Sequence, residues 1–357
     1  MRHVHIFTSD LHFTDAPSDE YRFGIFDELA KHANAWRKTE EDDVKFREEI
    51  HIWLLGDLTD KKDHHSGRLL NRIFQGVKSL VDVSDRVHIV MGNHDYTDPS
   101  CSSVATLGYL NGVTFYDHPR VVDFDKGQPN GHSFGVFPHD FKAQENFPDA
   151  VERMIDDGAG WLDLILLHQC VDRAKSETGM EMKGLAMDVF DPIGYGHALA
   201  GDIHVPQTLG DLTYCGAPYP ISWNDKHDTR ILVWDSEVGT TQSVRIPSIK
   251  KETIICDSAE SFAKAAAKYN EGDQIKVEMR TTEVAGADRF EAHDALTRAA
   301  KKLRHLNIRG ISVSVVEDSS LPDEAYRDVE TDVEVLDAYC VQKQVKKRRR
   351  KTGENLL

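Results

Sequence analysis

Short apolar runs alternate with helix-spaced apolar stripes through the first two-thirds of the chain. Strand-like runs fall at residues 4–8, 50–55, 87–91, 162–167 and 197–200. Residues 23–37 carry apolar side chains at helix spacing, and a second helical stripe runs from Leu69 to Val81. This strand–helix–strand alternation predicts an α/β layered fold. From about residue 210 to 234 the pattern changes to strand and turn, which we interpret as the closing edge of the same sheet system.

A different pattern begins near residue 248. Strand-like runs at 252–256, 275–279 and 311–316 alternate with a helix that starts after Ser258 and another at 288–306. Serine is a favoured residue at a helix N-cap. We therefore predict a catalytic-size domain at 1–248, a small α+β domain at 249–318 and a C-terminal segment at 319–357.

The bulk composition excludes several classes of protein. The chain has 357 residues, and none of its apolar runs approaches the roughly 20 residues that span a bilayer. Its five cysteines are scattered, without a Cys-x-x-Cys pair, which argues against a disulfide framework or a cysteine zinc site. The N-terminal sequence lacks the apolar core of a signal peptide. We therefore expect no membrane partner and a cytoplasmic location, in a prokaryotic cell or in the host of a virus.

Charge is unevenly distributed along the chain. The net charge of −17 argues against a nucleic-acid coat protein, yet residues 343–351 form a dense basic run. Three interpretations of this run stay open: a solvated tail, an arm that contacts DNA, or part of a helix that docks on a partner. Phosphate contacts made by such an arm would release counterions from DNA.

Candidate metal ligands follow directly on five of the apolar runs. These residues are Asp10 and His12, Asp57 and Asp60, Asn93 and His94, His168, and Asp202 and His204. Ligands of open α/β sheets bind at the carboxyl ends of strands, so the five segments are expected to converge. Carboxylate, imidazole and amide donors without thiolate suit manganese, iron, zinc or magnesium. The set is large enough for two cations about 3.5–4 Å apart with a shared carboxylate.

The ordered set Asp10-x-His12, Gly56-Asp57, Gly92-Asn93-His94-Asp95, His168 and Gly201-x-x-His204 resembles the calcineurin-like metallophosphoesterase signature. The resemblance implies a four-layer α/β/β/α sandwich over roughly residues 1 to 235. It implies that one metal is held by Asp10, His12 and His204, and the other by Asn93, His168 and Asp202. Asp57 would bridge the two metals, and His94 would contact the phosphate. The implied reaction is hydrolysis of a phosphoester.

A narrower resemblance is carried by residues 201–207 and 214–220. These segments are similar to the nuclease subunit of SbcCD-type DNA repair and recombination complexes and its bacteriophage counterparts. The resemblance implies a DNA-binding cap at 249–318 and a manganese-dependent exo- and endonuclease that acts on duplex ends and single strands. It also implies a homodimer whose C-terminal segment docks on a coiled-coil ATPase subunit.

Two positions depart from the pattern of these families. Asp202 stands where a histidine is usual, which makes the second metal site richer in oxygen and favours manganese or magnesium over zinc. Asp60 stands where the repair nucleases often have histidine and resembles the phosphatases instead. An aspartate there could orient the ring of His94 and raise its basicity.

Two other functions remain open. The first is a small-molecule phosphatase or cyclic-nucleotide phosphodiesterase of the same fold, which Asp60 favours. The second is a largely non-catalytic scaffold that positions an ATPase on DNA, for which Asp202 is the only support. Histidines outside the motifs, at positions 3, 5, 51 and 88, are expected to be packed or edge side chains, and His132 is expected in a loop.

Overall fold

The computed structural model describes residues 1–37, 48–98, 101–128, 130–223, 225–281 and 286–315. The predicted docking segment at 319–357, with its basic run, lies outside the described residues. The chain divides into two compact units. The first holds Met1–Glu252 with Tyr269–Gln274, and the second holds Thr253–Lys268 and the described residues from Ile275 to Val315.

The first unit contains a six-stranded sheet in the order β14-β13-β1-β2-β3-β6. Its strands are β1 (Arg2–Thr8), β2 (Glu48–Leu55), β3 (Arg86–Val90), β6 (Val113–Tyr116), β13 (Arg230–Asp235) and β14 (Thr240–Arg245). β1, β2, β3 and β6 are parallel, whereas β13 and β14 run antiparallel at one edge. The late strands thus close the sheet at β1, as the strand-and-turn pattern near residues 210–234 predicted.

A second six-stranded sheet has the order β11-β12-β10-β9-β8-β7. Its strands are β7 (Arg120–Phe124), β8 (His132–Phe137), β9 (Leu162–His168), β10 (Tyr195–Gly201), β11 (Gln207–Leu209) and β12 (Leu212–Tyr214). β8, β9, β10 and β12 are parallel, and both edge strands are antiparallel to their neighbours. Each sheet therefore presents several parallel strand ends to the same side.

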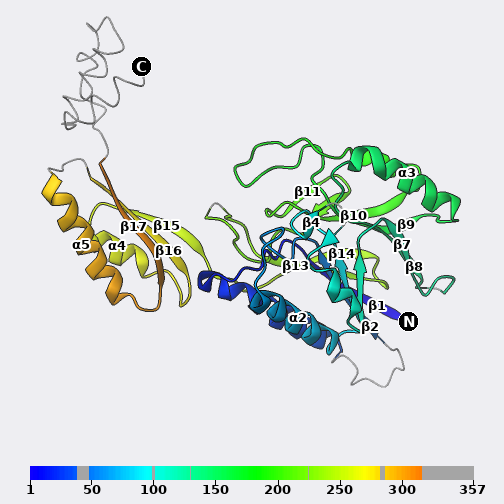
Figure 1. Cartoon of the computed structure of the whole chain (residues 1–357), viewed down its shortest axis with the longest axis horizontal. Coiled ribbons are helices and arrows are strands. Elements are labelled where there is room, and N and C mark those ends of the chain that lie inside the picture. The colour runs from blue at the N-terminus through cyan, green and yellow to red at the C-terminus, as the bar shows by residue number, and fades with distance from the viewer. Residues whose placement is uncertain (38–47, 99–100, 129, 224, 282–285, 316–357) are drawn as a thin grey trace, which may run out of the picture. The chain divides into compact units, whose positions relative to one another are not determined.

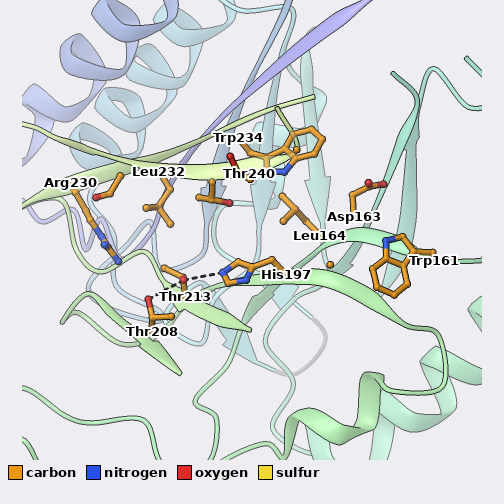
Figure 2. A pocket seen from close by; sticks show the side chains of 14 residues that line it. Trp161, Asp163, Leu164, His197, Thr208, Thr213, Arg230, Leu232, Trp234 and Thr240 are labelled. Carbon is orange, nitrogen blue, oxygen red and sulfur yellow. Dashed lines mark hydrogen bonds between the residues drawn. The ribbon is translucent and has the colours of Figure 1, made fainter. Parts of the chain in front are cut away.

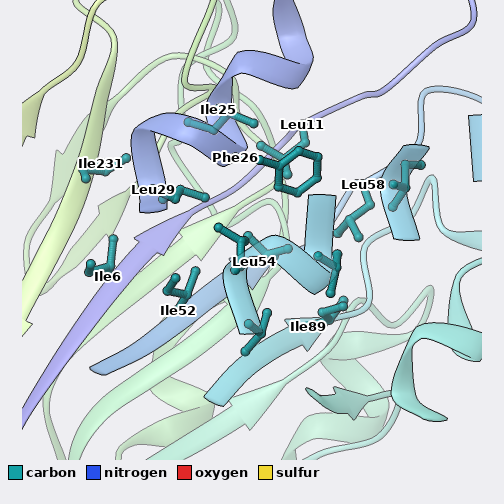
Figure 3. Close-up of a cluster of buried hydrophobic side chains, with 14 of the residues drawn as sticks. Ile6, Leu11, Ile25, Phe26, Leu29, Ile52, Leu54, Leu58, Ile89 and Ile231 are labelled. Atoms are coloured by element: carbon teal, nitrogen blue, oxygen red, sulfur yellow. The ribbon is translucent and has the colours of Figure 1, made fainter. Parts of the chain in front are cut away.

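Three hydrophobic layers show that the unit is a four-layer sandwich. Helices α1 (Ile25–Arg37) and α2 (Gly67–Val81) pack on the first sheet, where Phe26 and Leu29 cover Ile52 and its neighbours (Figure 3). A second layer lies between the two sheets, and a third lies between the second sheet and α3 (Ala143–Asp156). Figure 1 shows α2 and α3 on opposite sides of the paired sheets. The predicted α/β/β/α fold is confirmed.

Helix α2 shows where the hydrophobic pattern over-predicts burial. Ser66 caps it by accepting a hydrogen bond from the backbone N–H of Leu69. Residues at helical spacing from Leu69 to Leu80 are buried, but Leu70 and Phe74, which belong to the same apolar stripe, are 37% and 41% exposed. The apolar stripe is therefore wider than the face that the first sheet covers.

Shorter elements connect these layers. They are η1 (Pro17–Gly24), β4 (Tyr96–Asp98), β5 (Cys101–Ser102), η3 (Ala105–Tyr109) and η4 (Met187–Phe190). Among the described residues, no helix is both long and apolar enough to cross a bilayer. The four cysteines within the described ranges are free thiols.

The second unit is built on a three-stranded sheet. Its elements are β15 (Lys251–Cys256), α4 (Ala259–Ala266), β16 (Gln274–Thr281), α5 (Gly286–Lys302) and β17 (Asn307–Val315), with the strand order β15-β16-β17. Ser258 caps α4 in a reciprocal capping box with Ser261, as its position before the helical stripe predicted. The DNA-binding role of this module and its domain boundary at 248 stay predictions.

A hydrogen-bonded chain of imidazoles lies between the two sheets. Nε2 of His3 contacts Oδ2 of Asp125, Nδ1 of His3 contacts Nε2 of His51, and Nδ1 of His51 contacts Nε2 of His88, at 3.1, 3.2 and 3.2 Å. The chain ends where Nδ1 of His88 meets the hydroxyl of Tyr116 at 2.8 Å. Because a carboxylate only accepts, each neutral ring must donate from Nε2 and accept at Nδ1. In the neutral form, both ring nitrogens of each of these three imidazoles then have a partner.

A second, shorter chain of hydrogen bonds also has a single donor-to-acceptor direction. The indole of Trp53 donates to Nδ1 of His5, Nε2 of His5 lies 2.9 Å from Nε2 of His132, and Nδ1 of His132 lies 3.1 Å from the carbonyl of Asn130. All these imidazoles are buried, which confirms the expectation of packed histidines at 3, 5, 51 and 88. His132 was expected in a loop, but it lies in β8 and is also buried. With their nitrogens already paired, these rings need no metal.

Candidate metal centre

The two sheets bring their candidate ligands to one place. Asp10 and His12 follow β1, Asp57 follows β2, and the Asn93–His94 pair follows β3. From the second sheet, His168 is the last residue of β9, and Asp202 comes directly after β10. Three overlapping clusters of side chains with mutually close donor atoms result: Asp10, His12 and His204; Asp10, Asp57 and His168; and His12, Asp57 and His94. The convergence expected from the strand ends is therefore present.

The backbone is strained at four of these positions. Asp10, His12, Asp57 and Asp202 have φ angles of 57, 44, 53 and 89°. This left-handed region is uncommon for residues with a Cβ atom, and such residues cluster at functional sites. Three of the four, Asp10, His12 and Asp57, belong to the clusters of close donor atoms.

Two glycines permit the close approach of these segments. A Cβ atom at Gly92 would lie 2.3 Å from the backbone nitrogen and from Oδ1 of Asp57. A Cβ atom at Gly56 would lie 2.1 Å from Nδ1 of His168, and Gly56 itself has a φ of 88°. Both positions therefore require glycine, because any side chain would push Asp57 or His168 out of place.

His168 directs Nε2 toward a group of oxygens. Its Nδ1–H donates to the carbonyl of Leu55 at 2.6 Å, which leaves Nε2 as an acceptor in the neutral ring. That Nε2 lies 3.0 Å from Oδ1 of Asn93 and 3.3 Å from Oδ1 of Asp57. Oδ1 of Asn93 also lies 3.1 Å from both Asp57 oxygens. Acceptors that face acceptors at these distances repel each other unless a cation, a proton or a reversed amide lies among them.

A second group of donor atoms, which is richer in nitrogen, lies on the other side of Asp57. Nε2 of His12 is 3.1 Å from Nε2 of His204 and 3.6 Å from Oδ2 of Asp57. Nδ1 of His12 is buried and has no hydrogen-bond partner. Asp10 completes this group, held by a 2.5 Å hydrogen bond from the hydroxyl of Ser9 to its Oδ2. The two oxygens of Asp57 thus face different imidazoles, His12 on one side and His168 on the other, as a bridging carboxylate would.

The electrostatics of the centre favour positive charge. Burial alone would lower the pKa of His168, but the carboxylate of Asp57 outweighs it and holds that pKa well above its ordinary value. Burial would raise the pKa of Asp57, yet the neighbouring His168 holds it well below its usual range. Burial raises the pKa of Asp10 and of Asp202. Buried carboxylates crowded together need compensating cations, so the donor set fits divalent metals.

His94 is oriented by a main-chain group. Its Nδ1–H donates to the carbonyl oxygen of Asp60 at 2.6 Å, and its backbone N–H donates to Oδ1 of Asp57 at 2.8 Å. The sequence hypothesis gave the orienting role to the carboxylate of Asp60. In the structure that carboxylate is 3.7 Å from Nδ1 of His12 and 40% exposed. The contact with His94 is thus one that any residue at position 60 could make.

Asp202 lies beside both halves of the centre. Its backbone N–H donates to Oδ1 of Asp10 at 3.1 Å, and its own Oδ1 is 3.9 Å from Nε2 of His168. The side chain is 18% exposed, whereas that of His168 is fully buried. Asp202 is therefore within reach of a cation bound near His168, and its role as a ligand stays a prediction.

Two supporting residues were missed by the sequence hypotheses. Asp95 is fully buried and accepts hydrogen bonds from the backbone N–H groups of Leu58, Thr59 and Gly92. It joins the loops after β2 and β3, and the motif Gly-Asn-His-Asp already contained it. Glu177 places Oε1 3.2 Å from Nδ1 of His204, from a loop that no motif marked.

A separate cavity lies at the other end of the second sheet. It has a volume of about 610 Å³ and is lined near the starts of β9 and β10 by residues that include Trp161, His197 and Arg230 (Figure 2). Nε2 of His197 is paired with the hydroxyl of Thr213 at 3.0 Å, and Arg230 donates to the carbonyls of Tyr214 and Cys215. The candidate ligands lie at the opposite strand ends, away from this cavity.

Comparison with known proteins agrees with the geometry. A family model described as calcineurin-like phosphoesterase matches residues 5–206. Exonuclease subunit 1 of Enterobacteria phage T4 is 24% identical over 242 residues, which are 66% of this chain and 65% of the phage protein. The chain thus spans slightly less than two-thirds of that relative.

Two solved structures show weaker likenesses. A Staphylococcus aureus protein described as a 5′-nucleotidase has 14% identity and a TM-score of 0.38, with 69% of this chain and 53% of that chain covered. Purple acid phosphatase PPD1 from yellow lupin has 10% identity and a TM-score of 0.39, with 68% and 53% covered. Likenesses of this size bear on neither substrate nor mechanism.

Proposed function

Because the chain belongs to the calcineurin-like phosphoesterase family, we propose that it is a two-metal phosphodiesterase whose substrate is DNA. The observation that carries the two-metal part is the position of Asp57. Its oxygens lie 3.6 Å from Nε2 of His12 and 3.3 Å from Nε2 of His168, between two separate groups of donors. One carboxylate that faces two such groups is what a pair of cations requires.

The proposed ligands divide around this carboxylate. Asp10, His12 and His204 would hold one cation, and Asn93, His168 and Asp202 the other. The oxygen-rich second group favours manganese or magnesium over zinc. When bound, the cations would supply electrophilic stabilisation of the phosphate and a water of lowered pKa.

His94 has the geometry of a phosphate-contacting group. Its Nδ1–H is committed to the carbonyl of Asp60, so Nε2 remains for the substrate. The ring lies 4.8 Å from that of His12, centroid to centroid, at the edge of the cluster. We propose that Nε2 hydrogen-bonds a phosphate oxygen or gives a proton to the leaving oxygen.

DNA as substrate is supported by the phage relative and by the segments at 201–207 and 214–220. The relative is an exonuclease subunit by name. We extend the proposal to a nuclease subunit of an SbcCD-type repair or recombination complex, working as a homodimer with a coiled-coil ATPase. Deletion of residues 325–351 should then abolish co-purification of the ATPase and leave basal phosphodiesterase activity intact.

The proposal is tested by digestion of end-labelled duplex and single-stranded DNA with manganese, beside a small chromogenic phosphodiester. The wild-type protein should degrade DNA, and Asp57→Asn should reduce cleavage to background. Asp63→Asn, an exposed carboxylate in the loop after β2, is the matched control and should keep full activity. Cleavage of the small diester alone would favour the small-molecule phosphoesterase. Failure to retain manganese at micromolar concentration would favour the scaffold.

A further inference from the structure

An exposed aromatic surface stands on three loops beside the metal centre. Phe141, from the segment after β8, is 60% exposed. Its ring centroid lies 5.4 Å from that of Tyr96 and 4.8 Å from that of His139. Nζ of Lys62 lies 5.7 Å from the Phe141 centroid. One aromatic ring is therefore supported by two others and accompanied by an ammonium group, while much of it faces solvent.

Hydrogen bonds to backbone carbonyls fix the three loops that form this surface. The hydroxyl of Tyr96 donates to the carbonyl of His139 at 2.7 Å, and the backbone N–H of His139 donates to the carbonyl of Met91 at 2.9 Å. The hydroxyl of Thr97 donates to the carbonyl of Lys62 at 3.4 Å. The loops after β2, β3 and β8 are thus tied together, so the ring of Phe141 is presented in a defined position.

The aromatic surface adjoins the proposed ligands directly. The ring of His139 lies 6.3 Å, centroid to centroid, from that of His168. Tyr96 follows His94 by two positions, and Lys62 follows Asp60 by two. A nucleic-acid strand whose phosphate lies at the metal centre would therefore place its neighbouring nucleotide near Phe141.

The chemistry of the surface selects an unstacked nucleobase as its occupant. A base stacks on an exposed aromatic face through its own π system, irrespective of sequence. The ammonium groups of Lys61 and Lys62, both exposed, provide positive charge for the adjoining phosphates in a protein whose net charge is −17. A small phosphomonoester would occupy the metal centre without reaching Phe141.

We propose that Phe141, supported by Tyr96 and His139, is a stacking site for an unpaired nucleobase next to the phosphate that is cleaved. This inference rests on the proposed function and narrows its substrate to strands with at least one base free of pairing. It also places Lys62 as the contact for the adjoining phosphate. A duplex end would have to fray before it could bind in this way.

The test compares two strands of equal length and charge, an oligothymidylate and an oligomer of abasic tetrahydrofuran sites. Binding is measured by fluorescence anisotropy with Mn²⁺ in a His94→Gln background, so that the strand is not consumed, and cleavage is measured in the otherwise native protein. Phe141→Ala should weaken binding of the oligothymidylate about 5- to 150-fold, the range of one lost base stack. The same substitution should leave binding of the abasic oligomer unchanged.

Two further variants separate stacking from a structural effect. Phe141→Trp should restore oligothymidylate binding, and Trp161→Ala, which removes an aromatic side chain that is 64% exposed at the far cavity, should change nothing. Equal effects of Phe141→Ala on both oligomers, or on neither, would overturn the inference. Base-dependent binding without any DNA cleavage would support the stacking site and refute the nuclease function, so the two failures are distinguishable.

Discussion

Acidification should weaken the layer between the two sheets, because that layer is built from neutral imidazoles. Burial lowers the pKa of His51 to about 3 and that of His132 to about 4. Burial also lowers the pKa of His5 and of His88 well below the ordinary value. Below the unfolded-state pKa of about 6.5, the unfolded chain binds protons that the folded chain excludes. The contribution of these histidines to the free energy of unfolding should therefore fall as the pH falls from 6.5 toward the folded-state pKa values.

The magnitude follows from proton linkage. A histidine that stays neutral in the folded state loses about 1.4 kcal/mol of stabilisation between pH 7.5 and 5.5. Four such residues together account for about 5–6 kcal/mol, which is comparable with the total stability of many domains. Burial and the charge of Asp57 raise the pKa of Asp95 to about 7. Protonation of this carboxyl between pH 7.5 and 5.5 therefore increases the free energy of unfolding by about 2 kcal/mol.

A single-residue comparison isolates the effect from the other titrating groups. His132→Gln keeps an acceptor for Nε2–H of His5 and a donor for the carbonyl of Asn130, but it removes one titrating ring. The difference in unfolding free energy between pH 7.5 and 5.5 should shrink by about 1.4 kcal/mol relative to the wild type. His118→Gln, at a side chain that is 67% exposed, is the matched control and should keep the wild-type difference.

The assay is urea unfolding followed by tryptophan fluorescence, in EDTA to remove bound metal. All five tryptophans lie in the first unit, so the signal reports on the sandwich. A His132→Gln protein with the same pH dependence as the wild type would refute the assignment of a neutral, proton-excluding ring.

Three other changes test the metal centre. Asp60→Ala should reduce kcat by less than about threefold, because the backbone carbonyl of residue 60 orients His94. His94→Ala should reduce kcat about 10²- to 10⁴-fold. Steady-state kinetics on the chromogenic diester measure both variants. Gly92→Ala should abolish metal retention, measured by elemental analysis after gel filtration, because its Cβ would meet Asp57 at 2.3 Å. Asp202→His should shift metal preference toward zinc, measured by competition between manganese and zinc, because it replaces a carboxylate donor by an imidazole.

Much of the sandwich was predictable because its parts have local signatures. The strand ends that carry Asp57 and His168 are apolar runs with a sharp polar stop, and the Ser258 cap directly precedes a helical stripe. Burial was less predictable. The stripe on α2 includes Leu70 and Phe74, which are 37% and 41% exposed, because periodicity marks an apolar face without recording how far the facing sheet extends.

The sequence by itself determined the kinds of donor available, their order along the chain and their place at strand ends. Those properties depend on residue type and on the spacing of apolar residues, and both can be read from short segments of sequence. Tertiary structure alone decided which atoms face each other. The closing of two sheets set the carbonyl of Asp60, rather than its carboxylate, against His94, and it placed Asp57 between His12 and His168. It also aligned the imidazoles from four strands into chains with one hydrogen-bond direction, since such contacts join residues far apart in sequence.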